Sequence, residues 1–236
     1  MNLSQFIALW ALLALAASAQ SNFYLKDKDT VVFYGDSITD QRLYTVATEA
    51  FVLTRFPDLR VRFVHSGWGG DRVTGGGGGN IETRLKRDVF PYHPTVVTIM
   101  LGMNDGRYRR FDEDTFTTFT TGFEKILSML NQDSPDVRLT LIEPSPYDDI
   151  TRAPGFADGY NAVLVRYGQY LRELSKRTPN SITADLNAGV VEMLRKANSG
   201  DADVAKKIIP DRVHPGWAGH LIMATELLKS WNAPHS

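Results

Sequence analysis

Three side chains of this sequence have the types and the spacing of a catalytic triad. Ser37 follows four apolar residues in the stretch VVFYGDSITD, and Asp211 precedes His214 by three residues. A carboxylate at that spacing can accept a hydrogen bond from imidazole Nδ1, which leaves Nε2 free to take a proton from a serine hydroxyl. Each feature alone has a simpler interpretation, because a serine after a strand is typical of a helix N-cap and Asp-x-x-His is common in surface turns. Together, in the order Ser, Asp, His, they favour nucleophilic catalysis by Ser37.

Donors for an oxyanion are predicted close to this serine. Attack of a hydroxyl on an ester carbonyl produces a tetrahedral intermediate, whose negative oxygen is stabilised by hydrogen-bond donors that are already in place. The backbone of Gly67–Gly70 can approach a ligand closely because glycine has no Cβ. Asn104 follows the apolar run Val96–Leu101 and offers a side-chain amide. Alone, each of these segments is also typical of a turn.

The rest of the chain alternates short apolar runs with longer helical patterns. Five runs lack polar alternation and indicate strands buried on both faces of a parallel sheet: Val31–Tyr34, Val61–Val64, Val96–Leu101, Val137–Ile142 and Ile182–Leu186. Apolar spacing predicts helices over Arg42–Phe56, Asn80–Val89, Phe116–Leu130, Gly159–Lys176, Asn187–Asn198 and Gly216–Trp231. This alternation predicts one doubly wound α/β domain with a three-layer α/β/α architecture. Ligands of such sheets bind beyond the carboxyl ends of the strands.

Four segments together resemble, in the same order, the sequence blocks of the SGNH, or GDSL-type, hydrolases. They are Gly35-Asp36-Ser37, Gly70, Gly102-Met103-Asn104-Asp105 and Asp211-Arg212-Val213-His214. The resemblance extends from Val31 to the final helix. It implies a flavodoxin-like sandwich with a five-stranded, mostly parallel sheet, and ester hydrolysis that needs no metal or other cofactor.

The resemblance also implies a role for each matching residue. Ser37 would be the nucleophile, His214 the base and then the acid, and Asp211 the residue that orients His214. The oxyanion hole would consist of the Ser37 and Gly70 amides and the Asn104 side chain. The resulting mechanism is a two-step acyl transfer through an acyl-enzyme.

Predicted export, a compact domain without an evident apolar lid, and polar residues beside the site together favour a short-chain, chiefly acetyl, ester of a carbohydrate. Trp68, Arg72 and Tyr108 are candidates for binding a sugar ring or an acidic sugar, although a solvated loop explains them equally well. An alternative within the same family is a small lysophospholipase or thioesterase-like lipolytic esterase. A non-catalytic carbohydrate-binding protein on the same fold is an alternative from another class, but it gives no reason for the triad.

Two further features suggest other chemistries. A metal-dependent phosphoesterase would draw on carboxylate and imidazole ligands: Asp36, Asp105, Asp211 and His214. The five-glycine run Gly75–Gly79 suggests a phosphate cradle, but no Lys-Ser or Lys-Thr follows it and Asn80 interrupts the dinucleotide-binding pattern. We therefore expect the run to be a flexible loop bordering the site, whose motion could gate substrate entry.

The first nineteen residues differ in character from the rest. An apolar stretch rich in Leu and Ala ends in Ala17-Ser18-Ala19, which predicts a secretory signal peptide over residues 1–19, cleaved after Ala19. The alternative is an uncleaved membrane anchor or an amphipathic helix. Residues 20–236 are then a single hydrolase domain, secreted or periplasmic and not associated with a membrane. A formal net charge of −1 gives no basic field for nucleic acid. The chain has no cysteine, so we expect no disulfides.

Overall fold

The computed structural model describes residues 23–234, so the predicted signal peptide lies outside the described residues. Their centre is a five-stranded sheet in the order β2-β1-β5-β6-β7, and every pairing in it is parallel. The strands are β1 (Thr30–Gly35), β2 (Arg62–Gly67), β5 (Val96–Met100), β6 (Arg138–Ile142) and β7 (Ser181–Ala184). In chain order this is 2-1-3-4-5, the flavodoxin-like arrangement. The predicted sheet and its five strands are confirmed.

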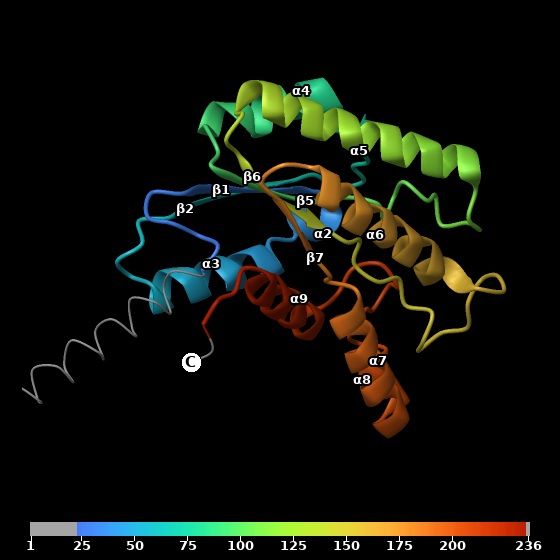
Figure 1. The fold of residues 1–236 in the computed structure, drawn as a ribbon. Helices are drawn as coiled ribbons and strands as arrows, with labels where there is room; N and C mark the ends of the chain where they lie inside the picture. The colour runs from blue at the N-terminus through green and yellow to red at the C-terminus, as the bar shows by residue number, and fades with distance from the viewer. Residues whose placement is uncertain (1–22, 235–236) are drawn as a thin grey trace, which may run out of the picture.

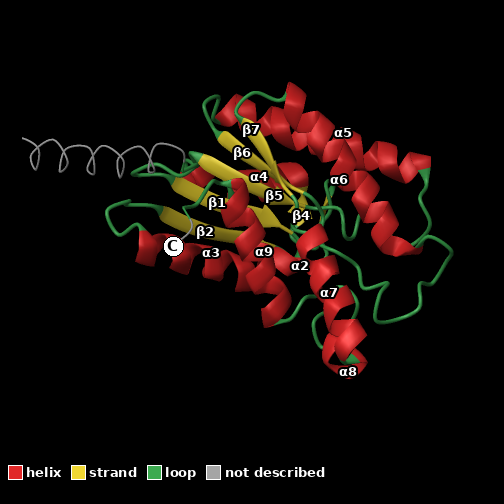
Figure 2. Ribbon diagram, turned by 60° about the horizontal axis from the view of Figure 1, so that its bottom comes forward, coloured by secondary structure: helices red, strands yellow, loops and turns green. Residues whose placement is uncertain are grey.

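Helices cover both faces of the sheet (Figure 1). One face carries α4 (Ile81–Asp88), α5 (Glu113–Asp133) and α6 (Gly159–Arg177). The other carries α3 (Leu43–Arg55) and α9 (Trp217–Ser230), with α7 (Ala188–Gly200) and the short α8 (Ala202–Ala205) beside α9. Figure 2 views the sheet from the α3 and α9 side. The three-layer α/β/α architecture predicted from the sequence is therefore confirmed. None of the described helices combines the length and apolar character needed to cross a membrane.

The core forms because the strands are apolar on both sides. Every residue of β5 is buried, and so are five of the six residues of β1. Helix α5 buries most of the predicted stripe, including Phe119, Phe123 and Leu130. It begins three residues earlier than predicted because the Asp112 side chain caps it by accepting a hydrogen bond from the Thr115 backbone N–H.

Four local features were not predicted, one of which is the short helix α8. The helix α2 (Ser37–Asp40) follows β1 directly, and the 3-10 helix η1 (Phe90–Tyr92) follows α4. The five-glycine run contains β3 (Gly75–Gly76) and begins β4 (Gly79–Asn80), which pair as an antiparallel hairpin. A Cβ on Gly78 would lie 2.7 Å from the Trp68 ring. The run therefore packs under an indole, and gating by its motion stays a prediction.

The parallel sheet brings distant segments to one edge. The carboxyl ends of β1 and β5 are neighbours, since Gly35 is in register with Met100. They lie at the point where the strand order reverses, which is where open α/β sheets bind ligands. Ser37 follows one of these ends and Asn104 follows the other.

Candidate active site

Ser37 is the first residue of α2, but it does not cap this helix. The cap is Asp36, whose Oδ1 accepts a hydrogen bond from the Ile38 N–H at 3.0 Å. The capping role that the sequence also allowed for Ser37 is therefore filled by Asp36. The Ser37 side chain is half-buried and its hydroxyl is available to a partner outside the helix.

That partner is His214. The Ser37 Oγ lies 2.8 Å from His214 Nε2, and His214 Nδ1 lies 2.7 Å from Asp211 Oδ2. The second carboxylate oxygen, Asp211 Oδ1, accepts hydrogen bonds from the backbone N–H groups of Val213 and His214 at 3.0 and 2.7 Å. The turn that holds this arrangement passes through Arg212, whose φ is +74°. The structure thus joins Ser37, His214 and Asp211 in one hydrogen-bonded chain across 177 residues.

Charge on Asp211 is favoured in the fold. Partial burial by itself would raise the pKa of this carboxyl, but the hydrogen bonds from the His214 backbone and ring and from Val213 outweigh it, so the pKa lies below its usual value. An ionised carboxylate here fixes a proton on His214 Nδ1 and stabilises the imidazolium that would form when Nε2 takes the serine proton.

Two buried carboxyl groups next to the site behave in the opposite way. Asp36 and Asp105 are both buried, and burial raises the pKa of each from 3.8 to about 7. The charge of Asp105 adds to the rise at Asp36. Asp105 Oδ1 accepts a hydrogen bond from the Val73 N–H at 3.0 Å, which joins the loop after β2 to the loop after β5.

The predicted oxyanion donors lie on these two loops. Asn104 Nδ2 donates to the Asp71 carbonyl oxygen at 3.0 Å, which links its side chain to the residue directly after Gly70. Gly70 has φ +74°, and a Cβ there would meet nothing within 4 Å, so this glycine serves backbone conformation and open access. The amide nitrogen of Asn104 carries two hydrogens, and only one is needed for the Asp71 carbonyl.

The three predicted substrate-binding residues differ in their surroundings. Trp68 is 40% exposed, and the guanidinium of Arg87 lies 4.9 Å from the centre of its ring. Arg72 Nε donates to the Asn104 backbone oxygen at 3.1 Å, and the Tyr108 hydroxyl donates to Asn104 Oδ1 at 2.8 Å. The polar groups of Arg72 and Tyr108 therefore contact a predicted oxyanion residue, whereas the partly exposed Trp68 indole packs against Arg84, Arg87 and Gly78.

Two features of the segments around this site were not predicted from the sequence. Arg84 is fully buried; its Nε donates to Asp71 Oδ2 at 2.7 Å and its second terminal nitrogen donates to the Ser66 carbonyl at 2.8 Å. Burying an ion pair is favourable only when the remaining donors are also hydrogen-bonded. The bonds of Arg84 to Asp71 and Ser66 meet this need and hold the Gly70–Asp71 segment in place. Trp217 is 62% exposed at the start of α9, three residues after His214. The place of Trp217 three residues after Asp211-Arg212-Val213-His214 is the sequence feature that could have marked it as a candidate.

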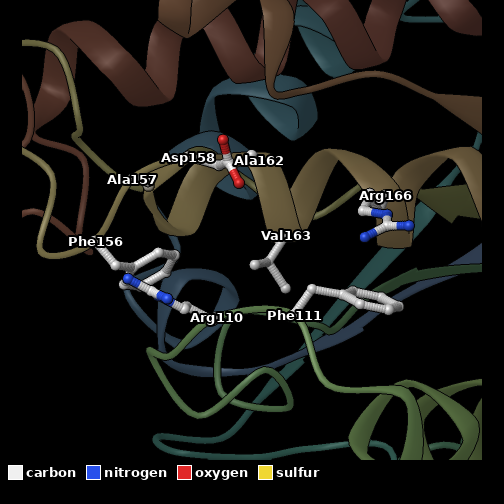
Figure 3. Close-up of a pocket in the computed structure, with 9 residues that line it drawn as sticks. Arg110, Phe111, Phe156, Ala157, Asp158, Ala162, Val163 and Arg166 are labelled. Carbon is white, nitrogen blue, oxygen red and sulfur yellow. The ribbon is translucent and has the colours of Figure 1, made fainter.

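Figure 3 shows residues that line a cavity of about 480 Å³. It is lined from the loop before α5 and from the first turns of α6, and includes Arg110, Phe111, Phe156 and Arg166. The guanidinium of Arg166 lies 3.8 Å from the centre of the Phe111 ring. No predicted catalytic or oxyanion residue lines it, so the cavity is separate from the proposed chemistry.

The ligands expected for a metal-dependent phosphoesterase are not gathered into one site. Within residues 23–234, no group of three or more His, Asp or Glu side chains has the geometry to hold a metal ion. The side chains of Asp36 and Asp105 instead accept hydrogen bonds from backbone N–H groups, and Asp211 faces His214.

Comparison with known proteins gives consistent results. The family described as GDSL-like Lipase/Acylhydrolase family matches residues 33–222. The acetylxylan esterase of Geobacillus stearothermophilus is 25% identical over 223 residues, which cover 85% of this chain and 93% of that protein. A crystal structure of Axe2, an acetylxylan esterase from the same organism, has a TM-score of 0.70 at 21% identity, over 88% of this chain and 96% of that one. This last likeness concerns the fold.

A second solved structure resembles the chain over part of its own length. It is a gut microbial diltiazem-metabolizing enzyme, with a TM-score of 0.74 at 28% identity. The match covers 88% of this chain and 47% of that enzyme, so this chain spans about half of its length.

Proposed function

Because the chain belongs to the GDSL-like lipase/acylhydrolase family and is a carboxylic ester hydrolase, we propose that it removes acetyl groups from a carbohydrate by acyl transfer to Ser37. The observation that carries this proposal is the hydrogen-bonded chain from Ser37 Oγ through His214 to Asp211, with both distances under 3 Å. This chain lies at the edge of the sheet where the fold binds ligands.

The chemistry follows from the positions of these atoms. Ser37 Oγ bonds to the ester carbonyl carbon while its proton passes to His214 Nε2, 2.8 Å away. The carbonyl oxygen becomes an oxyanion, which accepts hydrogen bonds from the Ser37 and Gly70 amides and from Asn104 Nδ2. When the carbon–oxygen bond to the leaving alcohol breaks, His214 returns its proton to that alcohol, and the acyl group stays on Ser37.

Water then completes the reaction. His214 takes a proton from a water molecule, whose oxygen bonds to the acyl carbon. The second tetrahedral intermediate collapses, Ser37 Oγ leaves and recovers the proton from His214, and the free acid is released. Asp211 orients the imidazole in both steps through its 2.7 Å contact with Nδ1.

The surroundings of the triad support a polymeric alcohol and a short acyl group. The side chains of His214 and Asp211 are 32% and 56% exposed, so the site is open to solvent on one side. The indoles of Trp68, two residues before Gly70, and of Trp217, three residues after His214, are exposed, and aromatic side chains suit the faces of sugar rings. The relatedness to an acetylxylan esterase supports the same substrate class.

The test is acetate release by the wild type and by Ser37→Ala from acetylated xylooligosaccharides, with a lysophospholipid as the comparison substrate. We expect the wild type to release acetate from the oligosaccharides, to leave the lysophospholipid intact, and to lose its activity with Ser37→Ala. Equal acetate release by both proteins would disprove the role of Ser37. Cleavage of the lysophospholipid alone would assign the enzyme to the lipolytic alternative.

A further inference from the structure

The Asn104 carboxamide is held at both of its polar atoms. The Asp71 carbonyl oxygen can only accept a hydrogen bond, so the atom 3.0 Å from it must be the amide nitrogen of Asn104. The amide oxygen then faces the Tyr108 hydroxyl at 2.8 Å. One of the two Nδ2 hydrogens bonds to the Asp71 carbonyl. The contacts with Asp71 and Tyr108 fix the planar carboxamide, and so they also fix the direction of the second hydrogen.

The backbone of this segment is shaped to bring Tyr108 back onto Asn104. The Arg107 N–H bonds to the Asn104 carbonyl at 3.3 Å, and both Arg107 and Tyr108 adopt left-handed conformations, with φ of +56° and +54°. Two successive residues with side chains rarely adopt this conformation, and it persists only where surrounding contacts determine it. This turn therefore places the hydroxyl of Tyr108, which follows Asn104 by four residues, against the Asn104 side chain.

The Tyr108 ring is held in place by two other tyrosines. Its centre lies 5.1 Å from that of Tyr160 and 6.0 Å from that of Tyr147. Tyr160 also donates its own hydroxyl to the Met103 carbonyl at 2.6 Å, directly before Asn104. Burial raises the pKa of Tyr108 to about 12, so its hydroxyl keeps its proton and donates throughout the neutral range.

We propose that Tyr108 is a positioning residue of the oxyanion hole, whose hydroxyl holds the Asn104 carboxamide with its second N–H directed at the ester oxygen. This inference rests on the proposed function, in which Asn104 stabilises the oxyanion. It gives Tyr108 a role different from the substrate binding expected from the sequence, because its polar group is already bonded to Asn104. Loss of the hydroxyl should therefore slow the chemical step and leave substrate affinity almost unchanged.

The test is a double-mutant cycle on hydrolysis of nitrophenyl acetate, with Tyr108→Phe, Asn104→Ala and the double variant. Tyr108→Phe keeps the ring and removes one hydrogen bond, so kcat should fall about two- to tenfold with little change in KM. Asn104→Ala removes the donor itself and should cost about 100- to 1000-fold in kcat. Once Asn104 is absent, the Tyr108 substitution should change kcat less than about twofold, because its effect passes through Asn104.

The matched control is Tyr147→Phe. Tyr147 belongs to the same ring cluster, but within residues 23–234 its hydroxyl makes no hydrogen bond, so kcat should stay at the wild-type value. Thermal unfolding of every variant is measured as well, to check that each one retains the fold.

Three results would overturn the inference. Tyr108→Phe with wild-type kcat would show that the hydroxyl does not matter. An equal loss with and without Asn104 would show that Tyr108 acts on the substrate directly. Wild-type kcat in Asn104→Ala would remove the oxyanion role on which the inference rests, and this result alone also contradicts the proposed function.

Discussion

Replacing the buried Asp105 by Asn should change how stability depends on pH. Asp105 Oδ1 is bonded to the Val73 N–H, whereas Oδ2 is buried without a hydrogen-bond partner among the described residues. Burial raises the pKa of this carboxyl from 3.8 to about 7 in the folded protein. Between pH 3.8 and about pH 7, Asp105 therefore keeps its proton in the folded state but has released it in the unfolded state.

The sign follows from proton linkage. Because the folded state binds more protons between pH 4 and pH 7, the free energy of unfolding falls as the pH rises through this window. Each unit is worth about 1.4 kcal/mol, so the Asp105 contribution falls by about 3 kcal/mol from pH 5 to pH 8. An asparagine does not titrate. Removing the charge of Asp105 also relieves Asp36, which adds to the effect in the same direction.

Urea unfolding at pH 5 and pH 8 measures this difference. The free energy of unfolding of Asp105→Asn, taken relative to the wild type, should rise by about 3 kcal/mol between the two pH values. The cost of burying an amide is nearly the same at both pH values and cancels. Asp136→Asn, at an exposed aspartate, is the control and should show no such change. A relative stability of Asp105→Asn that stays constant within about 0.5 kcal/mol would contradict the raised pKa of Asp105 in the folded protein.

Three other predictions concern the backbone, the substrate and the leader segment. Gly102→Ala should lower the free energy of unfolding by about 3 kcal/mol, because φ is +130° and the Cβ would lie 2.5 Å from the Pro144 ring. Gly70→Ala should cost only about 1 to 2 kcal/mol, because φ is +74° but a Cβ there would meet no atom within 4 Å. Equal losses in thermal unfolding would contradict this difference. Trp68→Ala should raise KM about tenfold for acetylated xylooligosaccharides but not for nitrophenyl acetate, and a rise on both would argue against a sugar platform. We propose export with cleavage after Ala19, so mass spectrometry of the secreted protein should find residues 1–19 removed, and an intact leader would contradict it.

The sheet could be predicted from the sequence because its strands are short apolar runs without polar alternation. Each of the five predicted runs overlaps an observed strand, and the helices between them follow the predicted patterns. The end of β7 was placed too late, since Asp185 Oδ1 accepts hydrogen bonds from the N–H groups of Asn187 and Ala188 and turns the chain. Such side-chain bonds to the backbone leave no periodic signal.

The glycine hairpin and the four-residue helix α2 depend on contacts between distant segments. Gly78 must pass under Trp68, and a Cβ on Gly67 would meet the backbone of Asp40 in α2. A sequence pattern carries neither distance. For the same reason the buried pair between Arg84 and Asp71 was not predicted, since its members are 13 residues apart and on different elements.

The candidate site shows the same division. Asp211 and His214 are neighbours on one turn, so their contact could be predicted from a spacing of three. Ser37 and Asn104 could be singled out by residue type and position, whereas the choice of Gly70 within Gly67–Gly70 depended on the resemblance to known hydrolases. Tyr108 was expected near the site from its place in the chain, but its bond to Asn104 depends on a left-handed turn that no residue type requires. The catalytic roles of these residues stay predictions.

Covalent labelling tests whether Ser37 is the nucleophile and whether His214 activates it. The protein is treated with a fluorophosphonate, which forms a stable bond with an activated serine, and the adduct is located by peptide mass spectrometry. We expect one adduct, on Ser37, loss of acetate release in proportion to labelling, and little labelling in His214→Ala. An adduct on a different residue, or full acetate release after Ser37 is completely labelled, would contradict it.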